Sequence, residues 1–315
     1  EAAYSRLPFD PKQVPSPSYV IDEGKLKQNL EVLRQLRQDT GCKILLAQKA
    51  FSCYALYPLI GEYLDGVTSS SLHEARLGYE EMGKQVHTFA PAYRLDEFEE
   101  ILRYSDHIVF NTPSQWKRFR PLVEAADKKV SCGLRVNPEC STQDHAIYDP
   151  CAPGSRMGTT AAHLTAADLE GLEGLHFHTL CEQNSDALAT TLDAVEEKFG
   201  KYLSGMKWLN FGGGHHITRP DYDLETLRRC IRRMQQRYGV EVYLEPGEAV
   251  ALRAGYLVCT VLERMENHLS IAILDTTAAC HMPDVLEMPY RPPLLASACE
   301  GEKPYIYRLS GATCL

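Results

Sequence analysis

Eight short apolar segments alternate with helix-like segments between residues 43 and 247, and this repeat limits the chain to very few folds. The strand-like segments are residues 43–47, 66–69, 86–90, 107–110, 130–136, 175–178, 208–211 and 240–244. Helical patterns occupy residues 54–64, 72–82, 95–104, 113–126, 163–169, 186–206 and 224–238. Strands that are apolar throughout are typical of a parallel sheet covered by helices. An open doubly wound sheet alternates in the same way, but the count of eight favours a (β/α)8 barrel of the TIM type, an α/β fold.

The pattern changes after residue 247, which indicates a second, all-β domain. Its strand-like segments are residues 18–21, 255–262, 269–274 and 305–309. A polar turn at 266–268 joins the second and third of them. The predicted organisation is therefore a barrel over residues 25–255 and a smaller β domain formed by residues 1–24 and 256–315. Because the sequence stops soon after a strand-like segment, we expect the C-terminal part of this domain to be incomplete.

Composition excludes several classes of partner. The formal net charge is −9, and the only dense basic run, at 228–233, is interpreted as a solvated helix face, so we expect no nucleic-acid partner. No apolar run reaches the roughly 18 residues that a membrane helix needs. The 11 cysteines contain no CxxC pair, which favours reduced thiols in a cytoplasmic protein. The negative charge suits a cationic small-molecule ligand.

Lys49 is the first candidate for chemistry. In a barrel the carboxyl ends of the strands meet at one mouth, where active sites lie. Lys49 directly follows the first strand, so we expect its amine in a partly desolvated position. Desolvation lowers the pKa of a lysine and frees the amine to react with an aldehyde. The alternative is an ordinary surface lysine at a strand end.

Three consecutive glycines, Gly212, Gly213 and Gly214, follow the seventh strand. Because they carry no side chains, their backbone N–H groups are open to bind a phosphate group. A flexible turn is the alternative interpretation. A P-loop is excluded because no Gly-Lys-Ser/Thr sequence follows.

Glu245 and His178 stand at two further strand ends. A carboxylate opposite a pyridine nitrogen keeps that ring protonated and electron-withdrawing, and a flat imidazole can stack on it. The alternatives are an ion pair with an arginine for Glu245 and a hydrogen-bonded core histidine for His178. Other histidines nearby suggest a metal site instead, but no HxxxH or HExxH spacing supports one, so we expect no metal.

In order and spacing these motifs resemble the alanine-racemase-like, fold-type III enzymes that use pyridoxal 5′-phosphate (PLP), which include ornithine and diaminopimelate decarboxylases. The resemblance spans nearly the whole chain. It rests on Leu46–Ala50, Leu175–His178, Phe211–His215, Glu245–Glu248 and Gly311–Cys314.

This resemblance implies a role for each candidate. It implies that Lys49 holds the PLP aldehyde, that His178 stacks on the pyridine ring and that Glu245 pairs with the ring nitrogen. It also implies that Gly212–Gly214 bind the phosphate. Cys314 resembles the cysteine that the decarboxylases lend to the partner subunit's active site, so a homodimer with shared active sites is expected.

Within this family the sequence most resembles the carboxynorspermidine/carboxyspermidine decarboxylases. The matching segments are Leu180–Glu182, Phe211–His216, Glu245–Val250, Ile273–Asp275 and His281–Asp284. The resemblance implies decarboxylation of a carboxylated polyamine in spermidine biosynthesis. It also implies that Glu248 and Asp284, with Asp275 nearby, bind the cationic tail of the substrate.

Two residues separate this chain from other relatives. Many relatives carry arginine after Glu-Pro-Gly, where it meets an anionic group, whereas Glu248 favours an amine and argues against a diaminopimelate decarboxylase. Racemases weaken the electron sink with an arginine at the ring nitrogen, and Glu245 argues against that reaction. The alternatives that remain are an ornithine- or diaminopimelate-type decarboxylase, a non-catalytic PLP-binding protein and a phosphate-binding barrel enzyme without PLP.

Overall fold

The computed structural model describes residues 7–143, 146–295, 297–298 and 301–314 of the chain. Two compact units divide the protein. The barrel unit spans Leu26–Leu252, and the β unit combines Glu1–Lys25 with Arg253–Leu315. The domain limits expected from the sequence, at residues 25 and 255, stay a prediction.

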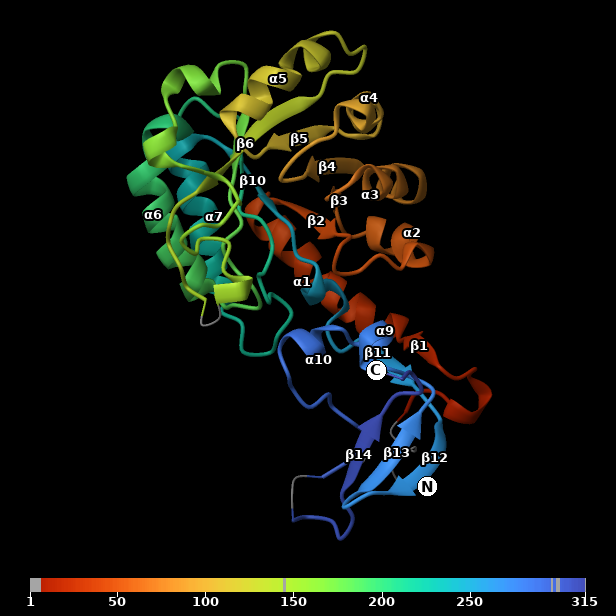
Figure 1. Cartoon of the computed structure of the whole chain (residues 1–315). Helices are drawn as coiled ribbons and strands as arrows, with labels where there is room; N and C mark the ends of the chain where they lie inside the picture. Colours follow the sequence, from red (N-terminus) through yellow and green to blue (C-terminus); the bar gives the residue numbers. More distant parts are fainter. Residues whose placement is uncertain (1–6, 144–145, 296, 299–300, 315) are drawn as a thin grey trace. The chain divides into compact units, whose positions relative to one another are not determined.

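Within the described residues of the barrel unit, eight parallel strands close into a barrel (Figure 1). They are β2 (Lys43–Ala47), β3 (Gly66–Ser69), β4 (Gln85–Phe89), β5 (His107–Phe110), β6 (Ser131–Asn137), β8 (Gly174–His176), β9 (Trp208–Asn210) and β10 (Glu241–Leu244). The sheet closes because β10 pairs with β2 and β5 pairs with β6, while the short β7 (Thr159–Thr160) extends β6 on one side. The predicted (β/α)8 fold is confirmed.

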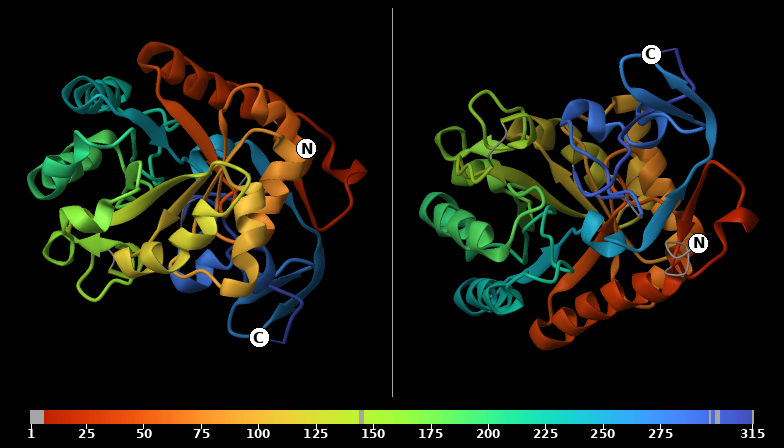
Figure 2. Two further views of the ribbon diagram at one scale, coloured as in Figure 1. Left: turned by 90° about the horizontal axis from the view of Figure 1, so that it is seen from above. Right: turned by 90° about the horizontal axis from the view of Figure 1, so that it is seen from below.

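Helices cover the outside of the barrel and form the ring seen along its axis in Figure 2. They are α1 (Glu23–Thr40), α2 (Tyr57–Gly61), α3 (Leu72–Leu77), α4 (Leu95–Tyr104), α5 (Pro113–Glu124), α6 (Ser185–Leu203) and α7 (Leu224–Tyr238). The last strand is followed only by one turn, α8 (Glu248–Ala251). α1, which precedes the first strand, therefore supplies the helix that the eighth repeat lacks.

The sequence-based reading starts at residue 43 and misses α1. Its leucines Leu26, Leu30, Leu33 and Leu36 recur at helical spacing and are fully buried. Asn29 also fixes α8, because its Nδ2 donates to the carbonyl oxygens of Val250 and Leu252.

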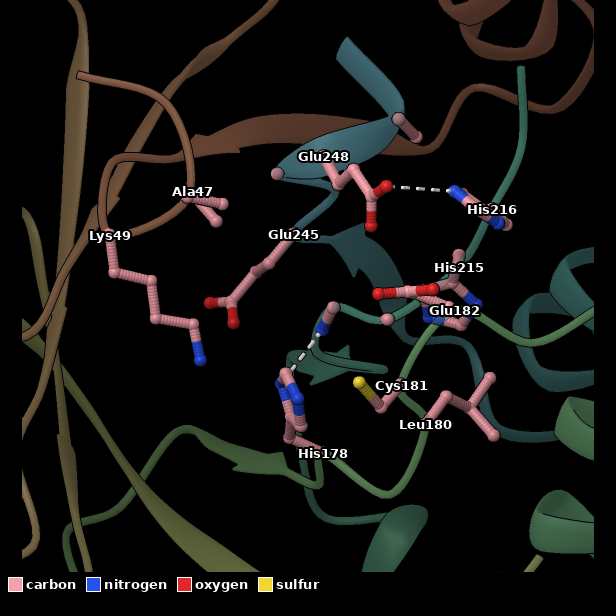
Figure 3. Close-up of a pocket in the computed structure, with 15 residues that line it drawn as sticks. Ala47, Lys49, His178, Leu180, Cys181, Glu182, His215, His216, Glu245 and Glu248 are labelled. Atoms are coloured by element: carbon pink, nitrogen blue, oxygen red, sulfur yellow. Dashed lines mark hydrogen bonds and ion pairs between the residues drawn. The ribbon is translucent and has the colours of Figure 1, made fainter. Parts of the chain in front are cut away.

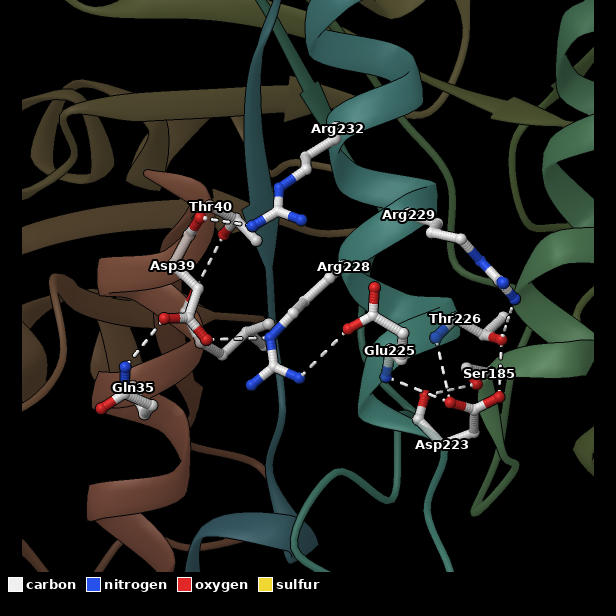
Figure 4. Close-up of polar contacts among 11 residues, drawn as sticks. Gln35, Asp39, Thr40, Ser185, Asp223, Glu225, Thr226, Arg228, Arg229 and Arg232 are labelled. Atoms are coloured by element: carbon white, nitrogen blue, oxygen red, sulfur yellow. Dashed lines mark hydrogen bonds and ion pairs between the residues drawn. The ribbon is translucent and has the colours of Figure 1, made fainter.

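Arginines of α7 bind acids of both neighbouring helices. Arg228 Nε lies 2.8 Å from Asp39 Oδ2 of α1, and Arg232 donates to the Asp39 carbonyl oxygen (Figure 4). On the other side Arg233 pairs with Asp193 and Glu196 of α6. The arginines of 228–233 are exposed or half-buried, as expected for a solvated helix face, and they also pair with acids of the neighbouring helices. These arginines join three helices.

Three predicted helices are shorter or differently wound than the pattern suggests. Segment 54–64 is a 3₁₀ turn followed by α2, and 72–82 is α3 followed by a π-helical turn, Gly78–Met82. Segment 163–169 contains only 3₁₀ turns, Ala161–His163 and Ala166–Leu169. Gly78 packs directly on β3, since an added Cβ would lie 2.2 Å from Val67 Cγ2.

A packed core fills the barrel interior. Trp208 lies there with Leu45, Val109 and Tyr243. Its ring fits only because two neighbouring strands carry glycine, and a Cβ added at Gly174 would lie 2.0 Å from Trp208 Cδ2. The interior is therefore a core rather than a channel, which leaves the strand ends as the place for a ligand.

The β unit contains two small sheets. In the first, β1 (Ser18–Ile21) pairs antiparallel with β11 (Gly255–Val258). In the second, β13 (Ser270–Leu274) lies between antiparallel β12 (Val261–Glu266) and parallel β14 (Tyr307–Ser310). The predicted β texture, with the N-terminal strand included, is confirmed.

Two features of the β unit differ from the prediction. The expected strand 255–262 is two strands, β11 and β12, with different partners. The extended strand is interrupted between them, where Thr260 N donates to Asp275 Oδ1 at 2.9 Å. Two short helices, α9 (Ala278–His281) and α10 (Asp284–Glu287), were not predicted. None of the helices in the described part of the chain has the length and apolarity required to span a membrane.

Candidate active site

A pocket of about 170 Å³ opens at the carboxyl ends of the barrel strands (Figure 3). Lys49, His178, Gly213, Gly214, Glu245 and Glu248, six of the residues expected to form the site, line it. Gly212 directly precedes two of them in the same loop. Four segments that are far apart in the sequence thus meet at one mouth, as the barrel topology requires.

Lys49 lies in a tight turn after β2. Ala47 N donates to the carbonyl oxygen of Pro246 at 3.0 Å, which ties this turn to the end of β10. The preceding Gln48 is buried and donates through Nε2 to Ser69 Oγ at 2.8 Å, so the base of the turn is held firmly. The side chain of Lys49 itself is exposed. The expectation of a partly desolvated amine is wrong, because Lys49 extends from the turn into the open mouth.

His178 follows β8, and its ring is oriented by the glycine loop. Gly213 N donates to His178 Nδ1 at 3.0 Å. Burial, together with the charges of Arg135 and Lys49, holds the pKa of His178 well below its usual value. The ring is therefore neutral, and since Nδ1 accepts a hydrogen bond, Nε2 carries the proton. Arg135 supports the same segment by donating to the His178 carbonyl oxygen at 3.1 Å.

The glycine loop admits no side chain. Gly212 and Gly214 have φ values of 70° and 80°, in the left-handed region that favours glycine. A Cβ would lie 2.5 Å from the Phe177 carbonyl oxygen at Gly212, and 2.0 Å from that of Leu180 at Gly214. The loop thus packs backbone against backbone and keeps its front open for a bulky anionic group.

Glu245 is a buried carboxylate, 7% exposed, with one donor for each oxygen. His176 Nε2 lies 3.2 Å from Oε2, and Asn210 Nδ2 lies 2.8 Å from Oε1. Burial raises the pKa of Glu245, but the interactions with His176 and Asn210 outweigh it and lower the pKa to about 2. Burial also lowers the pKa of His176, so we assign a neutral imidazole that donates through Nε2–H to an ionised Glu245.

The far rim of the pocket from Lys49 is acidic (Figure 3). Glu182 and Glu248 line it, with the Cys181 thiol beside them. Burial raises the pKa of Cys181, and the charges of Glu182 and Glu248 raise it further. Glu182 has a φ of 54°, which is unusual for a residue with a side chain and holds it at the rim. This edge is suited to a positively charged group.

Two further histidines lie around the mouth. His216 Nε2 approaches Glu248 Oε1 at 3.5 Å, and His215 is buried with neither ring nitrogen hydrogen-bonded. In the described ranges no group of three or more His, Cys, Asp or Glu side chains is arranged to hold a metal ion.

Asp275, Asp284 and Cys314 belong to the β unit, and their predicted roles stay predictions. Both oxygens of Asp275 accept hydrogen bonds, from Ser16 Oγ at 2.5 Å and from Thr260 N at 2.9 Å. Asp284 Oδ2 accepts from the Tyr290 hydroxyl at 2.7 Å. Cys314 is an exposed free thiol.

Three buried polar side chains organise the pocket: Arg135, His176 and Asn210. Sequence reasoning gave no role to Arg135 or Asn210 and considered His176 only as a metal ligand. Each of the three lies in a barrel strand, and each is at most 5% exposed. A polar residue inside an apolar strand of a barrel was the available signal, because such a residue needs a buried partner.

Two named decarboxylases are similar to the chain over 96% of its length. The identity is 43% over 315 aligned positions with carboxynorspermidine/carboxyspermidine decarboxylase of Campylobacter jejuni, of which 81% is covered. It is 40% over 304 positions with carboxyaminopropylagmatine decarboxylase of Synechocystis, of which 78% is covered. No protein-family model matches the sequence.

Solved structures of decarboxylases are also similar to the chain. The structure of Campylobacter jejuni carboxynorspermidine decarboxylase complexed with norspermidine superimposes with a TM-score of 0.85 at 42% identity, covering 96% of this chain and 82% of that one. Diaminopimelate decarboxylase from Helicobacter pylori complexed with L-lysine gives a TM-score of 0.76 over 96% of this chain and 80% of its own. At 17% identity, this second match supports the fold alone.

Proposed function

This chain belongs to the carboxynorspermidine/carboxyspermidine decarboxylase family, and on that premise we propose that it binds PLP at the mouth of its barrel. There it removes carbon dioxide from carboxynorspermidine, carboxyspermidine or both, and so releases norspermidine or spermidine. One observation carries the proposal: a single pocket brings Lys49, His178, the glycine loop and Glu245 together.

The chemistry of these residues fits PLP. In the loop Gly212–Gly214 the N–H groups of Gly212 and Gly213 already donate to Asn210 Oδ1 and His178 Nδ1. The loop would therefore hold the phosphate through the Gly214 N–H and through a surface that carries no side chain. The buried, ionised Glu245 suits a protonated pyridine nitrogen, because an unpaired buried carboxylate would be costly. The flat, neutral ring of His178 would lie against the pyridine, and the Lys49 amine would hold the aldehyde carbon. Bound PLP supplies the electron-withdrawing ring that accepts the electrons left behind as carbon dioxide departs.

The residues of the chain perform the steps around that ring. Glu245 would keep the proton on the pyridine nitrogen and so preserve the positive charge of the ring. Cys314 of the partner subunit would hold, at its Sγ, the proton that replaces the lost carboxylate. This step requires a homodimer with shared active sites, which we propose on the resemblance of Cys314 to the decarboxylase cysteine.

Acidic side chains bind the cationic tail of the substrate in this proposal. Glu248, at the rim opposite Lys49, binds an ammonium group of the polyamine, and Asp284 binds another. We propose a lesser role for Asp275, since Ser16 and Thr260 already donate to its carboxylate. The negative charge of the chain favours the approach of such a cation. A cytoplasmic location follows from the same proposal, because the reaction belongs to polyamine biosynthesis.

The 40% identity with a carboxyaminopropylagmatine decarboxylase favours a second candidate substrate. Agmatine ends in a guanidinium group rather than an amine, and a carboxylate such as Glu248 binds either. Ornithine and diaminopimelate are weaker candidates, since the diaminopimelate decarboxylase from Deinococcus radiodurans is 27% identical over only 45% of the chain.

The test is a visible spectrum of the purified protein with PLP, recorded before and after each substrate is added, with carbon dioxide measured in parallel. The panel is carboxynorspermidine, carboxyspermidine, carboxyaminopropylagmatine, ornithine and diaminopimelate. A cofactor band that shifts as carbon dioxide forms with the first two supports the proposal. A shift with carboxyaminopropylagmatine alone transfers it to the second candidate, and the absence of any cofactor band contradicts it.

A further inference from the structure

Asn210 lies at the centre of a closed ring of hydrogen bonds under the pocket. It ends β9 and is fully buried. Its Nδ2 donates to Glu245 Oε1 at 2.8 Å, and its Oδ1 accepts from Gly212 N at 2.8 Å. The ring closes through the backbone, where Glu245 N donates to the Gly212 carbonyl oxygen at 2.8 Å.

The two ends of this amide cannot be exchanged. A backbone N–H is only a donor, so Gly212 requires the oxygen of Asn210. An ionised carboxylate is only an acceptor, so Glu245 requires the nitrogen. Among residues of this size, only asparagine offers one acceptor and one donor in that arrangement. Aspartate keeps the first bond and loses the second, whereas leucine loses both.

Glu245 receives its second donor from β8, the strand beyond β9 in the barrel. His176, at the end of β8, approaches Oε2, so β8 and β9 each supply one hydrogen bond to one carboxylate oxygen. The charge of the buried Arg135, from β6, also interacts with Glu245. The carboxylate is therefore fixed in orientation before any ligand arrives, and its remaining lone pairs face the pocket.

We propose that Asn210 is a positioning residue that couples the carboxylate of Glu245 to the glycine loop at Gly212. It would thereby join the contact with the ring nitrogen and the contact with the phosphate into one hydrogen-bonded unit. The inference rests on the proposed function, because it takes PLP as the ligand. It goes further, because Asn210 does not line the pocket and is nevertheless assigned the coupling between the two ends of the cofactor.

Two variants separate the two halves of this unit. Asn210→Asp retains the bond from Gly212 N but places an oxygen against Glu245, so only the ring-nitrogen end is impaired. Asn210→Leu removes both bonds. The matched control is Asn137→Asp, a buried asparagine at the end of β6 whose amide contacts only backbone atoms: the Pro150 and Met157 carbonyl oxygens and Glu139 N.

The measurement is the Kd of the apoprotein for PLP and for pyridoxal, which lacks the phosphate, followed by absorbance and protein fluorescence. Melting curves confirm that each variant is folded. In Asn210→Asp we expect both Kd values to rise by about tenfold, the cost of one charge-assisted bond, with their ratio unchanged. In Asn210→Leu we expect the Kd for PLP to rise more than that for pyridoxal, so that the benefit of the phosphate shrinks. Asn137→Asp is expected to leave both Kd values unchanged.

The outcomes distinguish a failure of the role of Asn210 from a failure of PLP binding itself. If wild type binds PLP and Asn210→Asp binds it equally well, Asn210 does not position Glu245 and the inference fails while the proposed function stands. A folded Asn210→Leu with the wild-type ratio of the two Kd values would also overturn the coupling. If wild type binds neither compound, the proposed function itself fails.

Discussion

His216 Nε2 lies 3.5 Å from Glu248 Oε1, so a histidine and the acid proposed to bind the substrate tail share the rim of the pocket. The Glu248 side chain is 49% exposed and His216 only 10%, which leaves the carboxylate accessible from solvent while the ring lies behind it. A cationic tail that reaches Glu248 therefore meets a carboxylate whose position is already supported from one side.

Replacing Glu248 with glutamine tests that role. Removing the charge weakens binding of an ammonium group without touching the cofactor, so we expect KM for carboxynorspermidine to rise about tenfold and kcat to change little. Steady-state kinetics provide the measurement. Glu225→Gln, on the outer face of α7, is the control and should match wild type. An unchanged KM in Glu248→Gln would remove Glu248 from the substrate site.

Replacing Lys49 with alanine tests the proposed cofactor attachment. The variant lacks the amine that holds the aldehyde, so we expect the visible band of bound PLP and the activity to disappear together. The control is Lys43→Ala at the opposite end of β2, where the ammonium lies 3.9 Å from Asp65 Oδ1. That variant should keep both signals. A Lys49→Ala protein with the wild-type cofactor spectrum would contradict the assignment.

Cys314 provides a test of the shared active site. Loss of a positioned proton donor typically lowers a rate about 10²-fold or more, so Cys314→Ala should lower kcat by that order while the PLP band remains. Cys280→Ala, another exposed thiol of the β unit, is the control. In mixed dimers of Cys314→Ala and Lys49→Ala chains, activity should partly return, since one site then holds both intact residues. No recovery would argue against sharing.

The pKa of Glu245 predicts how acid affects the fold. Its folded-state pKa of about 2 lies below the ordinary 4.5, so the folded protein binds fewer protons than the unfolded chain. The resulting stabilisation is complete above pH of about 4.5 and is lost as the pH falls towards 2. We expect the melting temperature of wild type to fall between pH 5 and about 3 more steeply than that of Glu245→Gln. Parallel curves for the two proteins would show that Glu245 is not the group responsible.

The close packing of Gly174 against Trp208 can be tested through the stability of the protein. A methyl group there would lie 2.0 Å from the Trp208 ring, so Gly174→Ala should destabilise the protein by about 1–3 kcal/mol and lower its Tm. Gly205→Ala is the control, because its Cβ would meet only the Tyr202 carbonyl oxygen at 3.6 Å. Combining Gly174→Ala with Trp208→Leu should recover part of the loss, whereas a normal Tm for Gly174→Ala alone would contradict this account of the core.

Periodicity predicted the barrel elements well where the period was distinct. The limits of α7 were predicted correctly, and in the structure the Asp223 side chain caps its first turn and Gly239 ends it in a left-handed conformation. The prediction of a helix over 163–169 was wrong because short 3₁₀ turns leave no distinct period. The prediction of one strand over 255–262 was wrong because its interruption at Thr260 depends on Asp275, a partner distant in the sequence.

The candidate site was predictable as a set of strand ends but not as a network. A barrel brings all strand ends together, so the meeting of Lys49, His178 and Glu245 follows from the fold. The partners of Glu245 did not follow, since only strand order and register bring Asn210 of β9 and His176 of β8 to this carboxylate. The exposure of Lys49 likewise depends on the turn that Gln48 anchors.

The position of α1 has a consequence for how the barrel unit is assembled during synthesis. The ribosome makes this helix before any barrel strand, yet its C-terminal end is bonded to α7, about 190 residues later in the chain, through Asp39 and Arg228. The outer ring is therefore complete only after α7 has been synthesised. Contacts between such distant segments are slow to form, so closure of the outer ring is expected to be a late step in folding.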